Sequence, residues 1–113
     1  MSYIVSMRVF RPRNFDRRAR RAGLDEDGVG DLIRILVERP DLGAVIPGTG
    51  GARKVRVRLP GRGKSGGACV IYAVVLRGTA LALLDVYAKS ERADITESER
   101  KMIAALIREI EAE

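Results

Sequence analysis

The sequence contains no histidine and a single cysteine, Cys69, and these scarcities exclude several classes of site. Without histidine, the chain lacks the side chain that most often acts as a general base near neutral pH. It also lacks the cysteine and histidine ligands typical of a zinc site, so we expect no metal and no cofactor. An internal disulfide is impossible, which is typical of proteins from a reducing compartment.

Long apolar runs are missing as well. The N-terminus has no apolar segment of signal-peptide length, and no stretch approaches the roughly 20 residues needed to cross a bilayer. We therefore expect a cytoplasmic protein with no membrane partner. A chain of 113 residues suffices for one domain and is short for two, so residues 1–113 are predicted to form a single domain.

Charge is the most unusual property that the chain does have. Lysine and arginine number 21 against 15 acidic residues, which gives a formal net charge of +6. An excess of this size favours a polyanionic partner, with nucleic acid first and an acidic protein second.

Apolar periodicity and turn residues predict one strand, two helices, three strands and a final helix. The predicted segments are a strand over 4–10, helices over 14–22 and 25–39, strands over 54–59, 69–76 and 80–88, and a helix that follows Thr96. Asn14 is predicted to cap the first helix, while Thr96 and Glu99 match a capping box. Met102 is predicted to lie on the buried face of the last helix. This order predicts an α+β domain with the helices packed on one face of a small, mostly antiparallel sheet.

The segment from Arg53 to Lys64 carries six basic residues and no acidic one. Strand alternation places Lys54, Arg56 and Arg58 on the same face, two residues apart. Two interpretations stay open. The row is either a solvated sheet edge that resists aggregation, or a face that binds phosphate groups.

The last predicted strand adds an aromatic residue to these cations. Alternation assigns Leu84, Val86 and Ala88 to the core. It assigns Asp85, Tyr87 and Lys89 to the opposite face. Bases stack on tyrosine while cations hold phosphates, so this combination suits RNA. The alternative is an ordinary half-buried tyrosine of a sheet.

The glycine-rich segment over 61–66 matches the pattern G-x-G-x-x-G, but it leads into a strand and offers no helix N-terminus to a pyrophosphate. A P-loop is excluded too, because Arg58 stands where its first glycine would fall. We therefore interpret the segment as a basic loop whose glycines let a ligand approach the backbone. The four arginines of the first predicted helix are interpreted as a solvated face.

Four segments together resemble the HigB branch of the RelE/ParE toxin superfamily. They cover residues 45–56, 61–67, 70–72 and 84–91, the last reading Leu-Asp-Val-Tyr-Ala-Lys-Ser-Glu. The resemblance runs from about Phe15 to the final helix, and the predicted order of elements is similar to that fold.

The resemblance implies a toxin of a type II toxin–antitoxin system that enters the ribosomal A site and cuts mRNA there. It also implies a cognate antitoxin of the helix-turn-helix type, through which alone the complex would contact operator DNA. Two alternatives stay open: a ParE-like inhibitor of gyrase without nuclease activity, and a degenerate toxin that acts as a corepressor with its antitoxin.

By similarity, the residues of the basic strand and of the last strand would form the catalytic site. RNA can be cleaved by attack of its own 2′-hydroxyl, and a lysine among other cations can serve as the base. Lys54 would be this base and Arg56 a phosphate clamp; Lys89 would stabilise charge and Tyr87 would stack on or orient a base. The residues expected to bind RNA around this site are Arg53, Arg58, Arg62 and Lys64.

One position departs from the family pattern. Relatives usually carry an arginine two residues after the Gly-Gly pair, where this chain has Cys69. Losing a charged phosphate ligand could reduce the rate on the order of 100-fold. The substitution therefore implies a weakened toxin, a different target, or a change that makes the protein tolerable to its host.

Overall fold

The computed structural model describes residues 7–59 and 66–112. Residues 4–6 of the predicted first strand and residues 61–65 of the glycine-rich segment lie outside these ranges. The elements are β1 (Arg8–Phe10), α1 (Arg13–Ala22), α2 (Glu26–Glu38), β2 (Ala44–Val45), β3 (Arg53–Val57), β4 (Ala68–Val75), β5 (Ala80–Ala88) and α3 (Glu97–Glu111). Strand β2 was not predicted. Within the described ranges, no helix combines the length and the apolar character that a membrane span requires.

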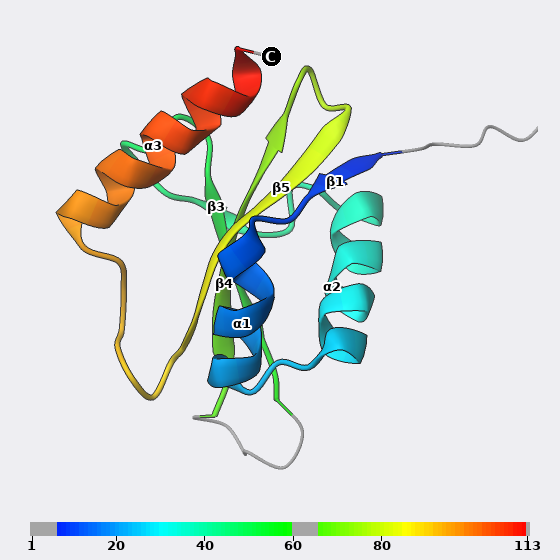
Figure 1. The fold of residues 1–113 in the computed structure, drawn as a ribbon, viewed down its shortest axis with the longest axis vertical. Helices are drawn as coiled ribbons and strands as arrows, with labels where there is room; N and C mark the ends of the chain where they lie inside the picture. Colours follow the sequence, from blue (N-terminus) through cyan, green and yellow to red (C-terminus); the bar gives the residue numbers. More distant parts are fainter. Residues whose placement is uncertain (1–6, 60–65, 113) are drawn as a thin grey trace, which may run out of the picture.

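The five strands form one sheet in the order β1-β5-β4-β3-β2. Strands β2 to β5 pair antiparallel and only β1 and β5 are parallel, which confirms the predicted mostly antiparallel sheet. β4 lies at the centre of the sheet, as its nearly unbroken apolar sequence indicates. Because β1 pairs only with Ala80–Ala82, the rest of the β5 edge lies uncovered by β1 and next to α1 (Figure 1).

Helices cover both faces of the sheet, so the prediction that they pack on one face is wrong. Residues of α1 and α2 such as Phe15 and Leu36 share a buried cluster with Val70 of β4. Ile103 and Ile107 of α3 pack in a second cluster on the opposite face. The reason is that β4 is apolar on both faces, and each face needs its own cover.

The predicted helix termini are correct at two helices and wrong at one. Thr96 and Glu99 form the expected capping box of α3. Asp25 caps α2 and accepts a hydrogen bond from the Gly28 amide at 2.8 Å. Asn14, by contrast, caps nothing, because α1 begins one residue earlier, after Pro12, whose ring fixes the backbone for a helix start.

Two predictions about buried side chains fail. Met102 is 69% exposed, because α3 meets the sheet along the narrow stripe of Ile103 and Ile107. Leu84 does not share a face with Val86: the register shifts there, and Leu84 packs with the α3-side cluster instead. Such a bulge adds one residue to a strand and reverses the alternation beyond it.

Candidate functional site

The basic residues of β3 divide between the two faces of the sheet. Val55 and Val57 pack against the cluster under α1 and α2, so Lys54 and Arg56 turn to the α3 side. Arg53 turns the other way, and its guanidinium donates to the carbonyl groups of Asp41 at 3.2 Å and Gly43 at 2.7 Å. Arg53 therefore does not share a face with Lys54 and Arg56, and its predicted contact with RNA stays a prediction.

Strand register brings the other predicted residues into rows across the sheet. Arg56 pairs with Cys69 on β4, and Cys69 pairs with Tyr87 on β5. Directly paired residues point to the same face, and neighbouring strands lie about 4.8 Å apart. Arg56 and Tyr87 thus flank Cys69 on the α3-side face. Lys54 lies in the adjacent row, which ends at Asp85.

Lys89 lies where this face ends. It directly follows β5, and its amide donates to the carbonyl of Gly67 at 2.9 Å. A β-carbon on Gly67 would lie 3.0 Å from the carbonyl oxygen of Val57 and 3.4 Å from Cγ of Arg56. The glycine therefore lets the Arg56 side chain run close to the end of β5 where Lys89 lies.

Of the remaining predicted RNA-binding residues, only Arg58 is among the residues that the structure describes. Arg58 is exposed, one residue after the end of β3, and borders a groove beside α2. Arg62 and Lys64 lie outside the described residues. The structure thus groups Lys54, Arg56, Tyr87 and Lys89 at one end of the α3-side face.

Tyr87 is covered and more deeply buried than the half-buried tyrosine that the sequence analysis left open as the alternative. Its side chain is 5% exposed, and the guanidinium of Arg92 lies 4.6 Å from the ring centroid. A base therefore cannot stack on the ring face that Arg92 occupies. Within residues 7–59 and 66–112, the hydroxyl of Tyr87 has no hydrogen-bond partner. The pKa of Tyr87 is raised, first by burial and then by the adjacent Cys69.

Arg92 belongs to a charged network that sequence reasoning missed. Its guanidinium makes two hydrogen bonds to the carboxylate of Glu99, at 2.9 and 2.8 Å, and lies 3.9 Å from Asp85. The bond to Arg92 lowers the pKa of Glu99 to about 2. The network ties the segment after β5 to the start of α3 and holds Arg92 over Tyr87.

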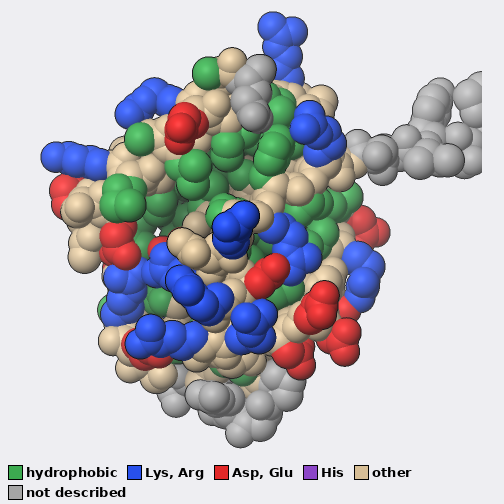
Figure 2. All heavy atoms as spheres, in the orientation of Figure 1, with side chains coloured by type: hydrophobic (Ala, Val, Ile, Leu, Met, Phe, Trp, Pro, Cys, Tyr) green, Lys and Arg blue, Asp and Glu red, His purple; other side chains and the backbone are tan. Residues whose placement is uncertain are grey.

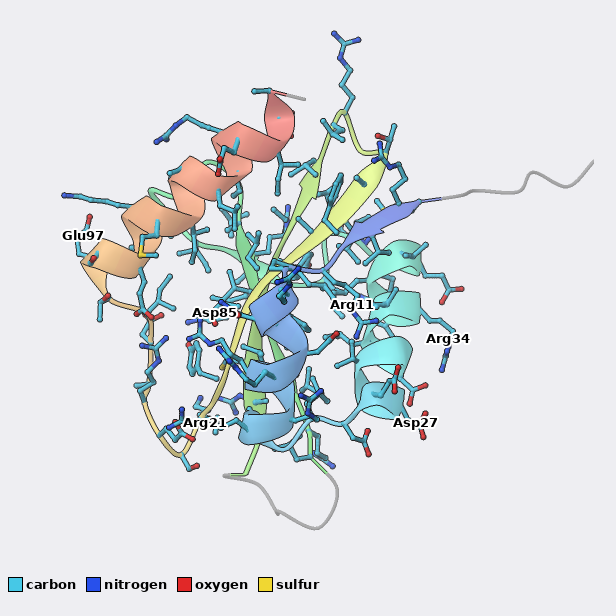
Figure 3. All side chains as sticks on the ribbon, viewed as in Figure 1. Arg11, Arg21, Asp27, Arg34, Asp85 and Glu97 are labelled. Carbon is cyan, nitrogen blue, oxygen red and sulfur yellow. The ribbon has the colours of Figure 1, made fainter. Side chains whose placement is uncertain are left out.

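Asp85 is the buried centre of this network. Arg18 of α1 reaches it at 3.0 Å from the other side, and the amide of Val86 donates to its carboxylate at 2.7 Å. Burial raises the pKa of Asp85, while Arg18 acts in the opposite direction. Figure 3 shows Asp85 on β5 between α1 and α3.

A second acidic residue, Asp94, holds one of the predicted catalytic cations. Its carboxylate lies 3.5 Å from the ammonium of Lys54. The amide of Ile95 lowers the pKa of Asp94, and Lys54 and Arg100 lower it further. RNA would have to compete with Asp94 for Lys54. The only feature of the sequence that indicates charged partners such as Asp94 and Arg92 is the alternation of acidic and basic residues after β5.

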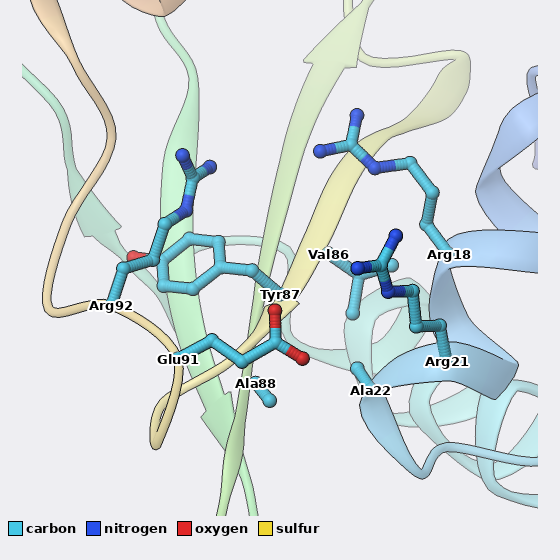
Figure 4. A pocket seen from close by; sticks show the side chains of 8 residues that line it. All are labelled: Arg18, Arg21, Ala22, Val86, Tyr87, Ala88, Glu91 and Arg92. Atoms are coloured by element: carbon cyan, nitrogen blue, oxygen red, sulfur yellow. The ribbon is translucent and has the colours of Figure 1, made fainter.

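A cavity of about 210 Å³ opens beside Tyr87, between β5 and α1 (Figure 4). It is lined by Arg18, Arg21, Ala22, Val86, Tyr87, Ala88, Glu91 and Arg92. Figure 2 shows lysine and arginine side chains gathered over this part of the surface. The arginines of α1 that border it were interpreted as solvated, whereas Arg18 is bound to Asp85. A cavity with arginines on both walls can accept an anionic group.

The chemistry available here is that of cations and a phenol. No group of three or more potential metal-binding side chains occurs within residues 7–59 and 66–112. Lysine and arginine side chains bind phosphate and stabilise the charge that develops when a phosphodiester is attacked.

Comparison with known proteins gives two matches. Residues 7–112 match the family described as the RelE toxin of the RelE/RelB toxin–antitoxin system. The fold is similar to that of a double arginine-to-alanine mutant of the toxin RelE from E. coli in the free state. That match has a TM-score of 0.57 and 18% sequence identity, and it covers 89% of this chain and 96% of the other.

Proposed function

The chain belongs to the RelE toxin family, and on this premise we propose that it is a ribosome-dependent endoribonuclease that cleaves mRNA in the A site. The observation that carries the proposal is the grouping of Lys54, Arg56 and Lys89 around Tyr87 at one end of a sheet face. Such a group of cations suits a ribose–phosphate link that is cleaved by its own 2′-hydroxyl.

The geometry supports a specific division of roles. Arg56 would clamp the phosphate, because its guanidinium offers several donors to phosphate oxygens. Lys89 would stabilise charge on the phosphorane from the end of β5. Tyr87 would support Arg92, on which a base could then stack in place of the covered ring. Lys54 would act as the base once RNA displaces Asp94.

The test is primer extension on a translated message with purified protein and ribosomes. Lys54→Ala and Arg56→Ala should each abolish the new mRNA ends. Arg34→Ala is the matched control, because Arg34 is an exposed arginine of α2 whose ion-pair partner among the described residues is Asp31. Its cleavage should equal that of the wild type.

One further substitution separates the two possible roles of Lys54. Lys54→Arg keeps the charge but removes a side chain that can release its proton at normal pH. Cleavage by Lys54→Arg would show that Lys54 supplies charge. Loss of cleavage would support its role as the general base. If wild-type protein makes no mRNA ends although translation and folding are intact, the nuclease proposal is wrong.

Cys69 favours a second candidate function. It is buried between Arg56 and Tyr87, at the position where the resemblance implies an arginine in related toxins. A toxin without this cation would bind its antitoxin and act as a corepressor. Cys69→Arg should raise cleavage markedly if the nuclease is attenuated, and should leave it absent if the chain has lost the activity. Gyrase poisoning would instead support the ParE-like alternative.

We further propose that the chain is of the HigB type. Its antitoxin would then carry a helix-turn-helix domain and contact operator DNA for the complex. The support is the resemblance of the four sequence segments. An antitoxin without such a domain would contradict this assignment.

A further inference from the structure

The open edge of β5 leaves one buried backbone group without a partner. β1 pairs only with Ala80–Ala82, so the rest of this edge has no strand beside it among the described residues. The amide of Lys89 donates to the Gly67 carbonyl on the β4 side, and backbone groups alternate along a strand, so Ala88 turns its amide to the open edge. Ala88 is buried, and the described residues supply no acceptor for this amide. Buried amides are nearly always paired, so this one marks a place for a further partner.

The cavity between β5 and α1 lies at this edge, because Ala88 is one of its lining residues. Arg18 and Arg21 extend from α1 on one side of it, and Tyr87 and Arg92 lie on the other (Figure 4). Alanine and valine side chains complete much of the lining. An anion in such a place interacts strongly with the arginines, because less water screens the charges than at an open surface.

The charged residues of the cavity differ in their capacity to bind an anion. Arg18 and Arg92 are each engaged by a carboxylate of the charged network described above. Arg21 is exposed, and no described carboxylate lies within ion-pair distance of its guanidinium. Among the described residues that line the cavity, Glu91 is the one acidic side chain. Arg21 and the Ala88 amide therefore retain the full capacity to bind an anion, and Glu91 opposes it.

We propose that this cavity binds a phosphate group of the RNA strand that neighbours the phosphate to be cleaved. Arg56 and Tyr87 are two strands apart, which is about 10 Å, and the cavity lies beyond Tyr87 at the edge of the sheet. One phosphate cannot contact both Arg56 and Arg21, so the cavity needs another phosphate of the same strand. The inference rests on the proposed function, because it takes Arg56 to hold the cleaved phosphate.

Glu91 favours a phosphate that belongs to a chain over a free anion. Its carboxylate repels any anion in the cavity, so a lone phosphate gains little from Arg21. A strand already held at Arg56 presents its neighbouring phosphate at a high effective concentration, which compensates for the repulsion. A carboxylate of the antitoxin is the alternative occupant. The succession of Arg56, Tyr87 and the cavity favours RNA, because one strand can follow it.

The test measures the affinity of the free protein for a short single-stranded RNA whose 2′-hydroxyls are methylated, so that it cannot cleave itself. Arg21→Gln should weaken binding by about 10-fold, because a charged phosphate contact is lost. Glu91→Gln should strengthen binding by about 3-fold, because a like charge is removed. Arg20→Gln is the matched control, since it removes the same charge from α1 but borders a different cavity, beside the start of α2. Its affinity should change by less than about 2-fold, because salt screens a charge at this distance.

A second measurement locates the phosphate. Each phosphate of the RNA is replaced in turn by a neutral methylphosphonate. The wild type should lose affinity at two neighbouring positions. Arg21→Gln should be insensitive to the change at one of them, and Arg56→Gln at the other. In addition, the NMR resonance of the Ala88 amide should shift when RNA is added to the wild type.

Equal affinities of Arg21→Gln and Arg20→Gln would overturn the inference, as would a wild type that binds no RNA. So would an Ala88 amide that responds to the antitoxin but not to RNA, which would assign the cavity to a protein carboxylate. Because the RNA in this experiment is not cleaved, the result is separate from that of the proposed function. Insensitivity confined to Arg56→Gln refutes only the cavity. The full expected result, from a protein that cuts no mRNA, refutes only the nuclease.

Discussion

The two faces of the central sheet bury different kinds of side chain. Under α1 and α2 the side chains are apolar, and the hydroxyl of Tyr72, which is fully buried, is satisfied by both the Gly43 amide and the Pro40 carbonyl at 2.8 Å. On the α3 side, apolar packing covers only part of the face. The rest carries Lys54, Arg56 and the unpartnered hydroxyl of Tyr87.

This difference separates the parts of one sheet that stabilise the fold from the parts that offer chemistry. Apolar packing contributes to the free energy of folding on both faces, whereas the exposed Arg56 and the buried, lone hydroxyl of Tyr87 on the α3 side add little or oppose it. Substitutions of similar chemistry on the two faces should therefore have different effects, and the predictions below compare them in order of decreasing size.

The largest effect is expected from Phe15→Ala on the α1/α2 face. Phe15 is 1% exposed and lies between α1 and the sheet, so truncation leaves a cavity in the main core. The free energy of unfolding should fall by about 3–5 kcal/mol. Urea unfolding followed by circular dichroism measures it. Met102→Ala on the exposed side of α3 is the control and should change stability by less than about 0.5 kcal/mol. Equal losses would contradict the separation.

Tyr72→Phe should give the next largest effect. The ring stays, but the Gly43 amide and the Pro40 carbonyl both lose their partner. The cost of leaving such groups unpaired is about 1–3 kcal/mol. The same unfolding experiment measures it, and the loop before β2 should become more sensitive to protease. A neutral result would mean that water replaces the hydroxyl.

The sequence predicted most of this scaffold because its signals are local. The capping box at Thr96, the stop at Pro40 and the bounds of β5 depend on neighbouring residues, and the structure agrees with them. The helices on both faces were missed, although the nearly unbroken apolar run of β4 indicates a strand buried on both sides. The bulge at Leu84 left no signal, because one extra residue does not alter an apolar run.

The site could be predicted only in part, because it depends on register and on distant ion pairs. Alternation placed Lys54 and Arg56 on one face, but only the pairing of β3 with β4 and β5 aligns Arg56 with Tyr87. Arg92 reaches Tyr87 and Glu99 from a segment without regular structure. No sequence period encodes such contacts, so the alternation of charges in that segment could not identify Arg92 as the residue that contacts Tyr87.

Glu99→Gln tests the charged network on the α3 side. Glutamine still fits a capping box, so the change keeps the helix cap but removes the charge that pairs with Arg92 and one of the two hydrogen bonds from its guanidinium. At neutral pH the loss should be about 1 kcal/mol, because the pair is partly solvated. The pKa of Glu99 is lowered from 4.5 to about 2 in the folded state. Its contribution to stability is therefore complete above about pH 4.5 and disappears as the pH falls through about 2.

Unfolding of Glu99→Gln and wild type at a series of pH values measures this difference. The two stabilities should converge as the solution becomes acidic. The raised pKa of Asp85 acts in the opposite direction, since its protonation favours the folded state as the pH falls. Asp85 is present in both proteins, and the charge of Glu99 is the smallest of the causes that shift its pKa. A difference that stays constant down to about pH 2 would show that Glu99 acts through packing rather than through its charge.

The smallest effect, and the one of opposite sign, is expected from Tyr87→Phe. This substitution matches Tyr72→Phe chemically, but it removes a buried hydroxyl without a partner and keeps the ring that lies against Arg92. Stability should stay equal or rise by up to about 1 kcal/mol, because an unpaired polar group leaves the interior. Urea unfolding of both variants beside wild type gives the comparison. A loss above about 1 kcal/mol in Tyr87→Phe would show that the hydroxyl has a partner, with Cys69 the nearest candidate, and the two faces would then no longer differ in this respect.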